Sequence, residues 1–467
     1  MAEFHESAGP VPEVATQHRR NWKRAHQWLG IDRAIGFTVL ARGWASAAGL
    51  VTVALIARFL SPAEQGYYYT FGSLIALQIV FELGFSLVIL QMASHERAHL
   101  AIGLEGGISG DIAAHARLAS VLQKTVRWYS GAALFLAVFL VTAGSHFFST
   151  HQHIGDNVAW RIPWYAAAIA ATFTFQLDPL LSFLEGCGFV ANVARLRLTQ
   201  AVTGSSLAWL VLAGHHGLFA PAMVIAGNAS VASIWLFRRR RLLLPLLRHE
   251  VGEHRIEWMK EVWPFQWRIA VSWLCGYFIF QLYNPVLFAF RGAVEAGQMG
   301  MSLSISSALL TIAVSWINTK ASPFGAMIAR KEYSQLDDVF FRAVKQGLVV
   351  CLAGILTVWF ADVYLNWAHI PLAHRVLDPV TFAMVLMIAP LNVIVFAQAT
   401  YLRAHKQEKF LLNSIMGAVL MGLSTYFLGK SFGAFGVAMG TLAIGLFIGL
   451  PWATYIFFKY RRIWHAA

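Results

Sequence analysis

The chain has 467 residues, of which 58% are hydrophobic and only 13% are charged. Soluble proteins carry roughly 25% charged residues, so a soluble fold could not hydrate so apolar a surface. Lys and Arg exceed Asp and Glu by 13, at 36 against 23. Cytoplasmic loops of membrane proteins account for such an excess, and no basic, aromatic-rich soluble module indicates a nucleic-acid partner.

A membrane-spanning helix needs about 20 mostly apolar residues, and about twelve such stretches follow one another along the chain. The first six are 35–60, 67–92, 126–147, 163–184, 196–213 and 217–237. The second six are 264–290, 297–318, 344–360, 380–402, 410–428 and 435–457. The sequence therefore predicts an all-α polytopic membrane protein.

The two halves of the chain repeat one another. Pro62-Ala-Glu-Gln-Gly66 precedes the second span, and Ala293-Val-Glu-Ala-Gly297 precedes the eighth. The segments that open the sixth and twelfth spans, at 217–223 and 433–439, also match. We therefore expect two homologous six-helix bundles, an architecture known in transporters. The predicted parts are a tail (1–34), an N-lobe (35–237), a linker (238–263), a C-lobe (264–459) and a second tail (460–467).

The distribution of basic residues favours an orientation with both termini in the cytoplasm, because Lys and Arg concentrate in the segments that this orientation places inside. The inner segments 95–124, 238–260 and 320–342 mix charged and apolar residues. They are typical of amphipathic helices at the membrane surface, with plain solvated connectors as the alternative. The outer loops are too short to hold a catalytic domain, and no metal-ligand spacing or phosphate-binding loop occurs, so we expect no enzyme activity and no cofactor.

The segment Leu55-Ile-Ala-Arg58-Phe-Leu60-Ser-Pro62-Ala-Glu-Gln-Gly66 resembles the first helix hairpin of polysaccharide flippases. These flippases belong to the multidrug/oligosaccharidyl-lipid/polysaccharide exporter superfamily. Pro62 is expected to start a tight turn, and Gly66 to let the chain enter the next helix without a Cβ clash.

The resemblance implies a secondary transporter of the cell inner membrane. Its cargo would be an oligosaccharide linked to undecaprenyl diphosphate, which it would flip by alternating access for cell-surface polysaccharide synthesis. Lipid-linked glycan and membrane lipids would be its partners, with a glycan polymerase or glycosyltransferases as further candidates. Two alternatives stay open: a drug/cation antiporter of the same superfamily, and a non-transport membrane subunit of a polysaccharide synthesis or secretion complex.

Charged residues within spans are costly in a bilayer and mark candidate sites. Arg42 and Arg268 lie near the inner ends of the first and seventh spans. The resemblance implies a cationic central cavity lined by these helices, and a guanidinium offers forked donors to a diphosphate. The alternative is that both side chains snorkel to the membrane surface.

Glu82 and Asp178 are the corresponding acids, in the second and fourth spans. A carboxylate at membrane depth can exchange protons or bind a cation during transport, or it can pair with a basic or polar neighbour. We therefore assign both provisionally to ion coupling or gating. Proline breaks the helical hydrogen-bond ladder, so Pro179, which follows Asp178, marks a possible hinge.

Asn284 and Pro285 stand together within the seventh span. A proline with polar neighbours predicts a bend that faces a wet cavity, with a tolerated kink between packed helices as the alternative. We therefore add Asn284 to the candidate substrate-binding residues and Pro285 to the candidate gating residues.

Overall fold

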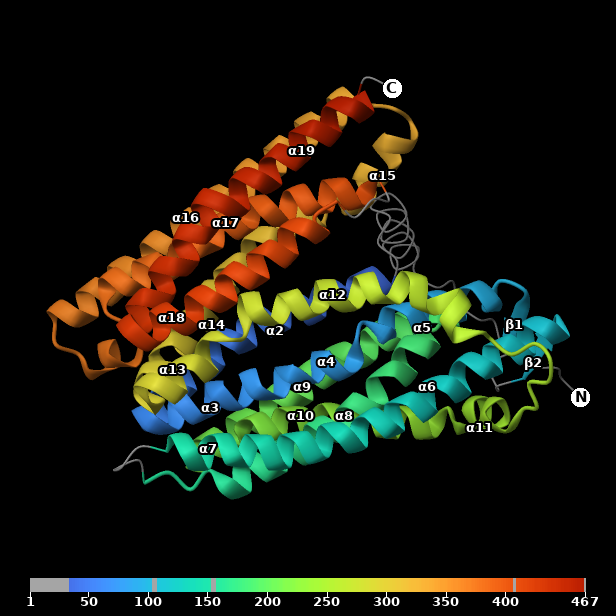
Figure 1. The fold of residues 1–467 in the computed structure, drawn as a ribbon, viewed down its shortest axis with the longest axis horizontal. Helices are drawn as coiled ribbons and strands as arrows, with labels where there is room; N and C mark the ends of the chain where they lie inside the picture. The colour runs from blue at the N-terminus through green and yellow to red at the C-terminus, as the bar shows by residue number, and fades with distance from the viewer. Residues whose placement is uncertain (1–32, 103–106, 153–156, 406–408, 466–467) are drawn as a thin grey trace, which may run out of the picture.

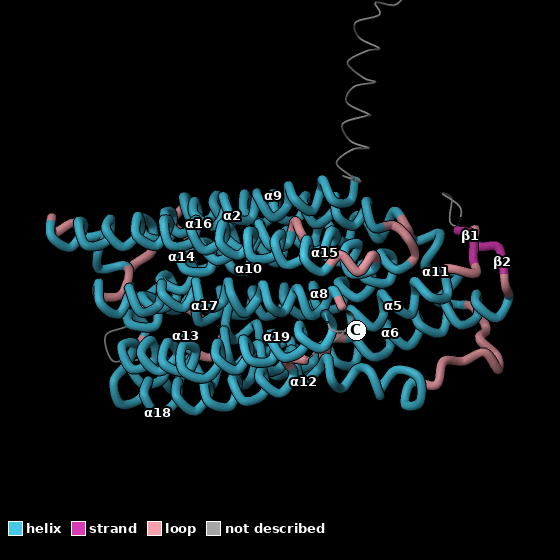
Figure 2. The backbone as a smooth tube through the Cα atoms, turned by 90° about the horizontal axis from the view of Figure 1, so that it is seen from above, coloured by secondary structure: helices cyan, strands magenta, loops and turns pink. Residues whose placement is uncertain are grey.

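The structure, a computed structural model, describes residues 33–102, 107–152, 157–405 and 409–465. The predicted tail at 1–34 therefore lies almost wholly outside the described residues. Helices form nearly all of the described chain, and Figure 2 shows them running along one long axis.

The described residues of the first lobe form nine helices, several of which join end to end. They are α2 (Arg33–Phe59), α3 (Pro62–Ile75), α4 (Ile79–Glu82), α5 (Phe85–Arg97), α6 (Ile112–Phe139), α7 (Ser145–His151), α8 (Arg161–Gly186), α9 (Val190–Ala213) and α10 (Ala220–Arg238). Single turns connect some of them, at Ala76–Gln78, Leu140–Gly144 and Gly217–Phe219.

The linker contains α11 (Arg240–Arg248) and a π-helical turn, Trp258–Val262. The helices of the second lobe are α12 (Trp263–Phe280), α13 (Tyr283–Arg291), α14 (Ala293–Asn318), α15 (Ala321–Ala329), α16 (Tyr333–Trp367), α17 (Pro379–Ala404), α18 (Leu411–Ile444) and α19 (Leu450–His465). Two further turns are Pro371–Arg375 and Gly445–Gly449.

The helices make twelve passes. By length and composition, eight described helices could cross a membrane, or ten when each bent pair, α3–α5 and α12–α13, counts as one span. α9 adds a pass, because it lies between α8 and α10 in the chain and packs along α2 and α10. The run Leu411–His465 holds two passes, which brings the total to twelve and confirms the predicted fold class.

The two passes within Leu411–His465 turn back at Gly433, whose φ of 63° and ψ of −146° are not helical. A Cβ added at Gly433 would lie 2.1 Å from Oε1 of Glu295, so only glycine fits this turn. The Asn413 side chain donates a hydrogen bond to the Gly449 carbonyl at 3.3 Å, because the two passes lie side by side. Both spans predicted over this stretch are confirmed.

We call the end of the bundle where α2 begins and α19 ends the termini side, and the opposite end the far side. In Figure 1 the two lobes meet on the far side and diverge towards the termini side. An even number of passes brings both ends of the described chain to the same side. The prediction that this side faces the cytoplasm is not tested by the fold.

The connecting segments on the termini side differ in part from the prediction. α11 is amphipathic, since Leu242, Leu243 and Leu246 are buried while its arginines face outward. The segment after α5 instead forms an antiparallel hairpin of β1 (Leu100–Ile102) and β2 (Ile108–Gly110), visible beyond the helix ends in Figure 2. The expected helix is wrong for these two strands, because Gly107 and Gly110 disfavour a helix and Gly110 has a φ of 133°.

Candidate functional site

The lobes meet on the far side through two helices, α3 and α14, that cross at glycines. A Cβ added at Gly66 would lie 1.8 Å from the Ala293 carbonyl oxygen, and one added at Gly297 would lie 2.7 Å from the Gly66 nitrogen. Gly66 lies within the helix α3, so its predicted role in helix entry is wrong. Its small size instead allows the two backbones to touch. The glycines that align in the sequence repeat are therefore the ones that meet in the structure.

Polar and aromatic side chains reinforce this contact, which we call the far-side seam. The buried Gln65 amide donates to the carbonyls of Gly297 and Arg375, both at 2.8 Å. Phe288 of the second lobe packs edge-on against Tyr67 of the first, with ring centroids 4.8 Å apart. The seam thus closes the far side with packed side chains.

Asn284 also belongs to the seam. Its amide is 8% exposed and donates to the Ser73 hydroxyl at 3.2 Å, across the two lobes. Pro285 lies beside it in the first turn of α13, after a 41° bend between α12 and α13. The bend predicted from these residues is present. In this conformation it faces the interface between the lobes and not an open cavity.

On the termini side the lobes separate. α15, α17 and α19 make their substantial contacts within the second lobe. α12 instead contacts α4 and α5 of the first lobe, through the end of α12 that lies on the termini side. In Figure 1 the backbone of α12 diverges from those of α15 and α17 towards the termini side.

Arg42 and Arg268 both lie on the termini-side half of a lobe's first helix, α2 and α12 respectively. Both residues are exposed, and neither forms an ion pair among the described residues. Each begins the pattern Arg-x-x-x-Ser, with Ser46 and Ser272 one helical turn further on. Because residues four apart share a helix face, each arginine has a hydroxyl beside it. Figure 2 places α2 and α12 at opposite edges of the bundle.

Glu82 lies where the second pass breaks. α4 ends at Glu82, and Leu83 and Gly84 take left-handed φ values of 50° and 69°. The helices on either side of this break differ in direction by 45°. A break leaves helix carbonyls without their intrahelical partners, and in transporters such half-helix ends coordinate cations. The Glu82 carboxylate is half-buried and accepts a hydrogen bond from Ser86 at 2.7 Å.

A side chain of the second lobe occupies the space at this break. A Cβ added at Gly84 would lie 2.3 Å from Cγ2 of Ile269, the residue that follows Arg268 on α12. The break next to Glu82 therefore touches the helix that carries Arg268. A movement of α12 would change the surroundings of Glu82 directly.

The structure brings Asp178 close to Glu82. The two carboxylates lie near enough for their charges to interact, and Arg197 is the basic group that acts on Asp178. Tyr129, which is 1% exposed, lies within the influence of both acids. Glu82, Ser86, Tyr129 and Asp178 form what we call the acidic cluster of the first lobe. Glu82 and Asp178, which were both predicted to serve ion coupling, thus lie in the same cluster.

Two features of this region escaped sequence analysis. The first is the break at Leu83–Gly84, for which the glycine after Glu82 was the one available signal. The second is a polar row on α14, where Ser307, Thr311 and Ser315 are exposed at four-residue spacing. Such spacing places them on one helix face, and α14 borders both lobes.

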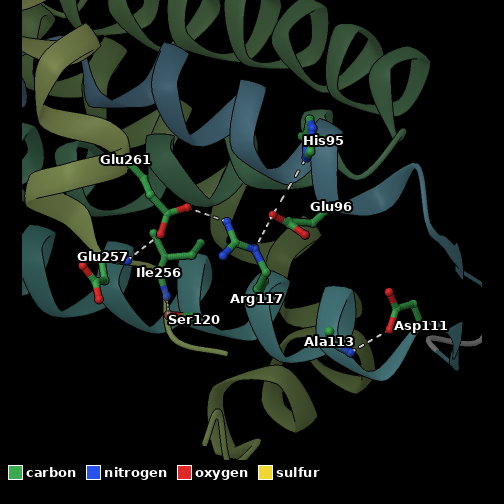
Figure 3. Close-up of polar contacts among 9 residues, drawn as sticks. All are labelled: His95, Glu96, Asp111, Ala113, Arg117, Ser120, Ile256, Glu257 and Glu261. Atoms are coloured by element: carbon green, nitrogen blue, oxygen red, sulfur yellow. Dashed lines mark hydrogen bonds and ion pairs between the residues drawn. The ribbon is translucent and has the colours of Figure 1, made fainter. Parts of the chain in front are cut away.

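Ion pairs fasten the linker to the first lobe on the termini side (Figure 3). Arg117 of α6 binds Glu96 of α5 at 2.8 Å and Glu261 of the linker at 2.6 Å. The hydrogen bond from Arg117 lowers the pKa of Glu261. Because Glu261 lies two residues before α12, this network fixes where α12 begins. No group of three metal-binding side chains occurs within the described part of the chain.

No known family's sequence profile matches the chain, and no curated protein matches it in sequence. Solved structures do match its fold. An inward-facing multidrug resistance MATE family transporter of the MOP superfamily gives a TM-score of 0.65 at 14% identity, covering 91% of this chain and 99% of that one. The lipid II flippase MurJ in an inward closed conformation gives 0.64 at 13% identity, covering 92% and 90%.

A third solved structure also shares the fold. An outward-facing MATE family transporter gives a lower TM-score of 0.57 at 13% identity, covering 94% of this chain and 97% of that one. The chain has the two-lobe membrane fold found in transporters of the MOP superfamily.

Proposed function

We propose that this protein is a secondary transporter that flips an oligosaccharide linked to undecaprenyl diphosphate across the inner membrane. The observation that carries the proposal is a pair of exposed arginines, Arg42 and Arg268, which lie on the first helix of each lobe and form no ion pair among the described residues. The termini side would face the cytoplasm. Cargo would enter there and leave after the lobes close on that side and part at the far-side seam.

The chemistry of the cargo fits these side chains. A diphosphate carries negative charge on oxygens spaced to accept paired hydrogen bonds, which a guanidinium supplies in a fixed fork. Ser272 would add a hydroxyl donor one turn from Arg268, whereas the Ser46 hydroxyl donates to the Arg42 carbonyl at 3.1 Å. A sugar head needs a polar path, to which the exposed hydroxyls of α14 would contribute, while the lipid tail stays in the bilayer. No bond is made or broken, so we infer transport without catalysis.

The acidic cluster would couple this movement to an ion gradient. Glu82 would bind a proton or a cation when the lobes are arranged one way and release it when they are arranged the other way. Its contact with α12 through Gly84 and Ile269 supports this role, because α12 would move with the second lobe. Asn284 and Pro285 would act at the bend of the seventh pass, which must rearrange when the seam opens.

The test is export in cells that depend on this protein. Arg42→Ala should abolish surface glycan and leave the lipid-linked precursor on the cytoplasmic face, and Arg268→Ala should do the same. Arg161→Ala, an exposed arginine at the far-side start of α8, is the matched control and should export normally. Normal export by an Arg42→Ala variant that inserts at wild-type levels would exclude the proposed role of the arginines.

A drug/cation antiporter is the second candidate function. The acidic cluster favours it, because carboxylates attract cationic drugs, and so does the likeness to MATE family transporters. Under this alternative, Glu82→Gln would abolish drug resistance and Arg42→Ala would not. A non-transport subunit of a polysaccharide synthesis complex would tolerate both substitutions, provided that the complex still forms.

The proposed partners follow from the cargo. They are the lipid-linked glycan, the surrounding membrane lipids, and the glycan polymerase or glycosyltransferases that would act before and after transport. Crosslinking in cells that make the glycan would detect such enzymes next to the lobes.

A further inference from the structure

A basic pocket lies on the termini side of the first lobe, apart from the separation between the lobes. It occupies about 330 Å³ between α6 and the linker segment that follows α11. The side chains that give it its charge are Lys124, Arg127 and Arg255, with Gln123, His249 and Glu250 also in the lining.

Hydrogen bonds hold the linker wall of this pocket against α6. Gln123 donates hydrogen bonds to the carbonyls of Leu246 and His249, at 3.2 and 2.8 Å. Lys124 donates to the carbonyl of Ile256, whose own N–H donates to Ser120 at 3.3 Å (Figure 3 shows the latter bond). The wall is thus held at both of its ends.

The three basic residues of the pocket outnumber its one acid, Glu250, so the lining carries a net positive charge. Arg127 and Arg255 form no ion pair among the described residues. Two other linker acids are bound elsewhere, since Glu261 binds Arg117 and Glu257 binds Lys260 at 2.5 Å. Lys124 and Arg255 also lie close enough to repel one another. An anion placed between them would relieve that repulsion.

The surroundings of the pocket are those of a membrane surface. Trp128, next to Arg127, is 47% exposed, and exposed tryptophans mark the boundary between headgroups and acyl chains. One to two turns further along α6, Leu134 and Phe135 are 67% and 72% exposed. A lipid whose headgroup entered the pocket would find an apolar helix face for its tails.

We propose that this pocket binds the phosphate group of an anionic membrane lipid, and that the bound lipid stabilises the linker against α6. The ligand chemistry is a phosphate held by Lys124, Arg127 and Arg255. Its source is a lipid headgroup and not free phosphate, because the apolar face of α6 continues from the pocket. This site is independent of the cargo site, so neither proposal depends on the other.

The test uses the full chain, purified in detergent and titrated with three probes. These are phosphatidylglycerol, zwitterionic phosphatidylcholine and inorganic phosphate, with occupancy measured by native mass spectrometry. We expect saturable binding of phosphatidylglycerol, none of phosphatidylcholine, and weak or no binding of inorganic phosphate. Inorganic phosphate binding as strongly as phosphatidylglycerol would overturn the assignment to a lipid.

Variants locate the binding. Arg127→Gln/Arg255→Gln should weaken phosphatidylglycerol binding roughly tenfold or more, as loss of two basic residues at a lipid surface predicts. Arg238→Gln/Arg241→Gln removes the same charge from exposed linker-proximal positions outside the pocket, and binding should change less than about twofold. Equal loss in both double variants, or loss in neither, would refute a specific pocket. Both pairs are exposed, so folding should survive, which gel filtration would verify.

Discussion

The two lobes share a fold but differ at membrane depth. In the first lobe, the second pass is broken after Glu82, whereas the equivalent pass of the second lobe, α14, runs unbroken from Ala293 to Asn318. Helices α8 and α17 each contain an internal proline, but the residue before it is Asp178 in one and Ala389 in the other. The first lobe thus carries acids where the second is apolar.

Among the described residues of the second lobe, the two buried acids are Asp337 and Asp362, and both lie on α16. Asp337 is near the termini-side start of α16 and is bound by Arg461 at 2.5 Å, so its charge is already neutralised. Under the proposed function, ion coupling would belong to the first lobe, and the second lobe would respond through α12.

The largest effect should come from removing the acid at the helix break. Glu82→Gln keeps the shape of the side chain and abolishes its titration, so we expect transport to fall about a hundredfold, as for other essential proton-transferring groups. Asp362→Asn, which changes a buried acid of the second lobe, is the control. Transport assays in proteoliposomes would measure both. Equal losses would remove the distinction between the lobes.

The seam offers a second test, in which the lobes should behave alike. Gly66→Ala places a methyl group against the Ala293 carbonyl, and overpacking of this kind costs about 1–3 kcal/mol. We expect the far side to open more often. A cysteine introduced at Ser73 would then react faster with a water-soluble maleimide.

Two further variants calibrate this result. Gly297→Ala should have a similar but weaker effect, because its nearest contact is longer. Gly72→Ala, on the same helix α3 with no atom within 4 Å of an added Cβ, should leave labelling unchanged. If the Gly72 variant labelled as fast as the Gly66 variant, the increase would not arise at the seam.

A substitution at Gly84 tests the contact between the helix break and α12. Gly84→Ala adds a methyl group at a left-handed residue, which costs about 1–2 kcal/mol, and that group also collides with Ile269. We expect a lower melting temperature, measured by scanning fluorimetry in detergent. Ile269→Ala in the same chain should restore part of the loss. A melting temperature unaffected by either change would mean that α12 does not rest on the break.

The smallest effect concerns the linker at low pH. Arg117 lowers the pKa of Glu261 below its ordinary value of 4.5, so the ion pair contributes fully above that value and is lost as the pH falls through the lowered pKa. Hydrogen exchange of the linker should therefore increase modestly below about pH 4. In Glu261→Gln this increase should be absent. A pH response that persisted in that variant would point to another group.

Sequence reasoning reached the fold because span length and apolar composition are local properties. The repeat also predicted which residues are equivalent, although not that Gly66 and Gly297 touch. The proximity of Glu82 and Asp178 could not be predicted, since it depends on packing between passes that are almost a hundred residues apart. Gly84 was the one sequence signal for the break beside it, but the left-handed conformation of Leu83 could not be predicted, because a leucine takes it only when tertiary contacts impose it. The binding roles of Arg42, Arg268 and Asn284 stay predictions.

The central claim is that the lobes move as bodies about the far-side seam. Distances between spin labels would test it most directly, with pairs at His95 and Lys331 on the termini side and at Ser149 and Lys430 on the far side. In nanodiscs, addition of undecaprenyl diphosphate should shorten the first distance and lengthen the second in the same molecules. If both distributions stayed single and unchanged, the lobes would not alternate, and the account would be contradicted.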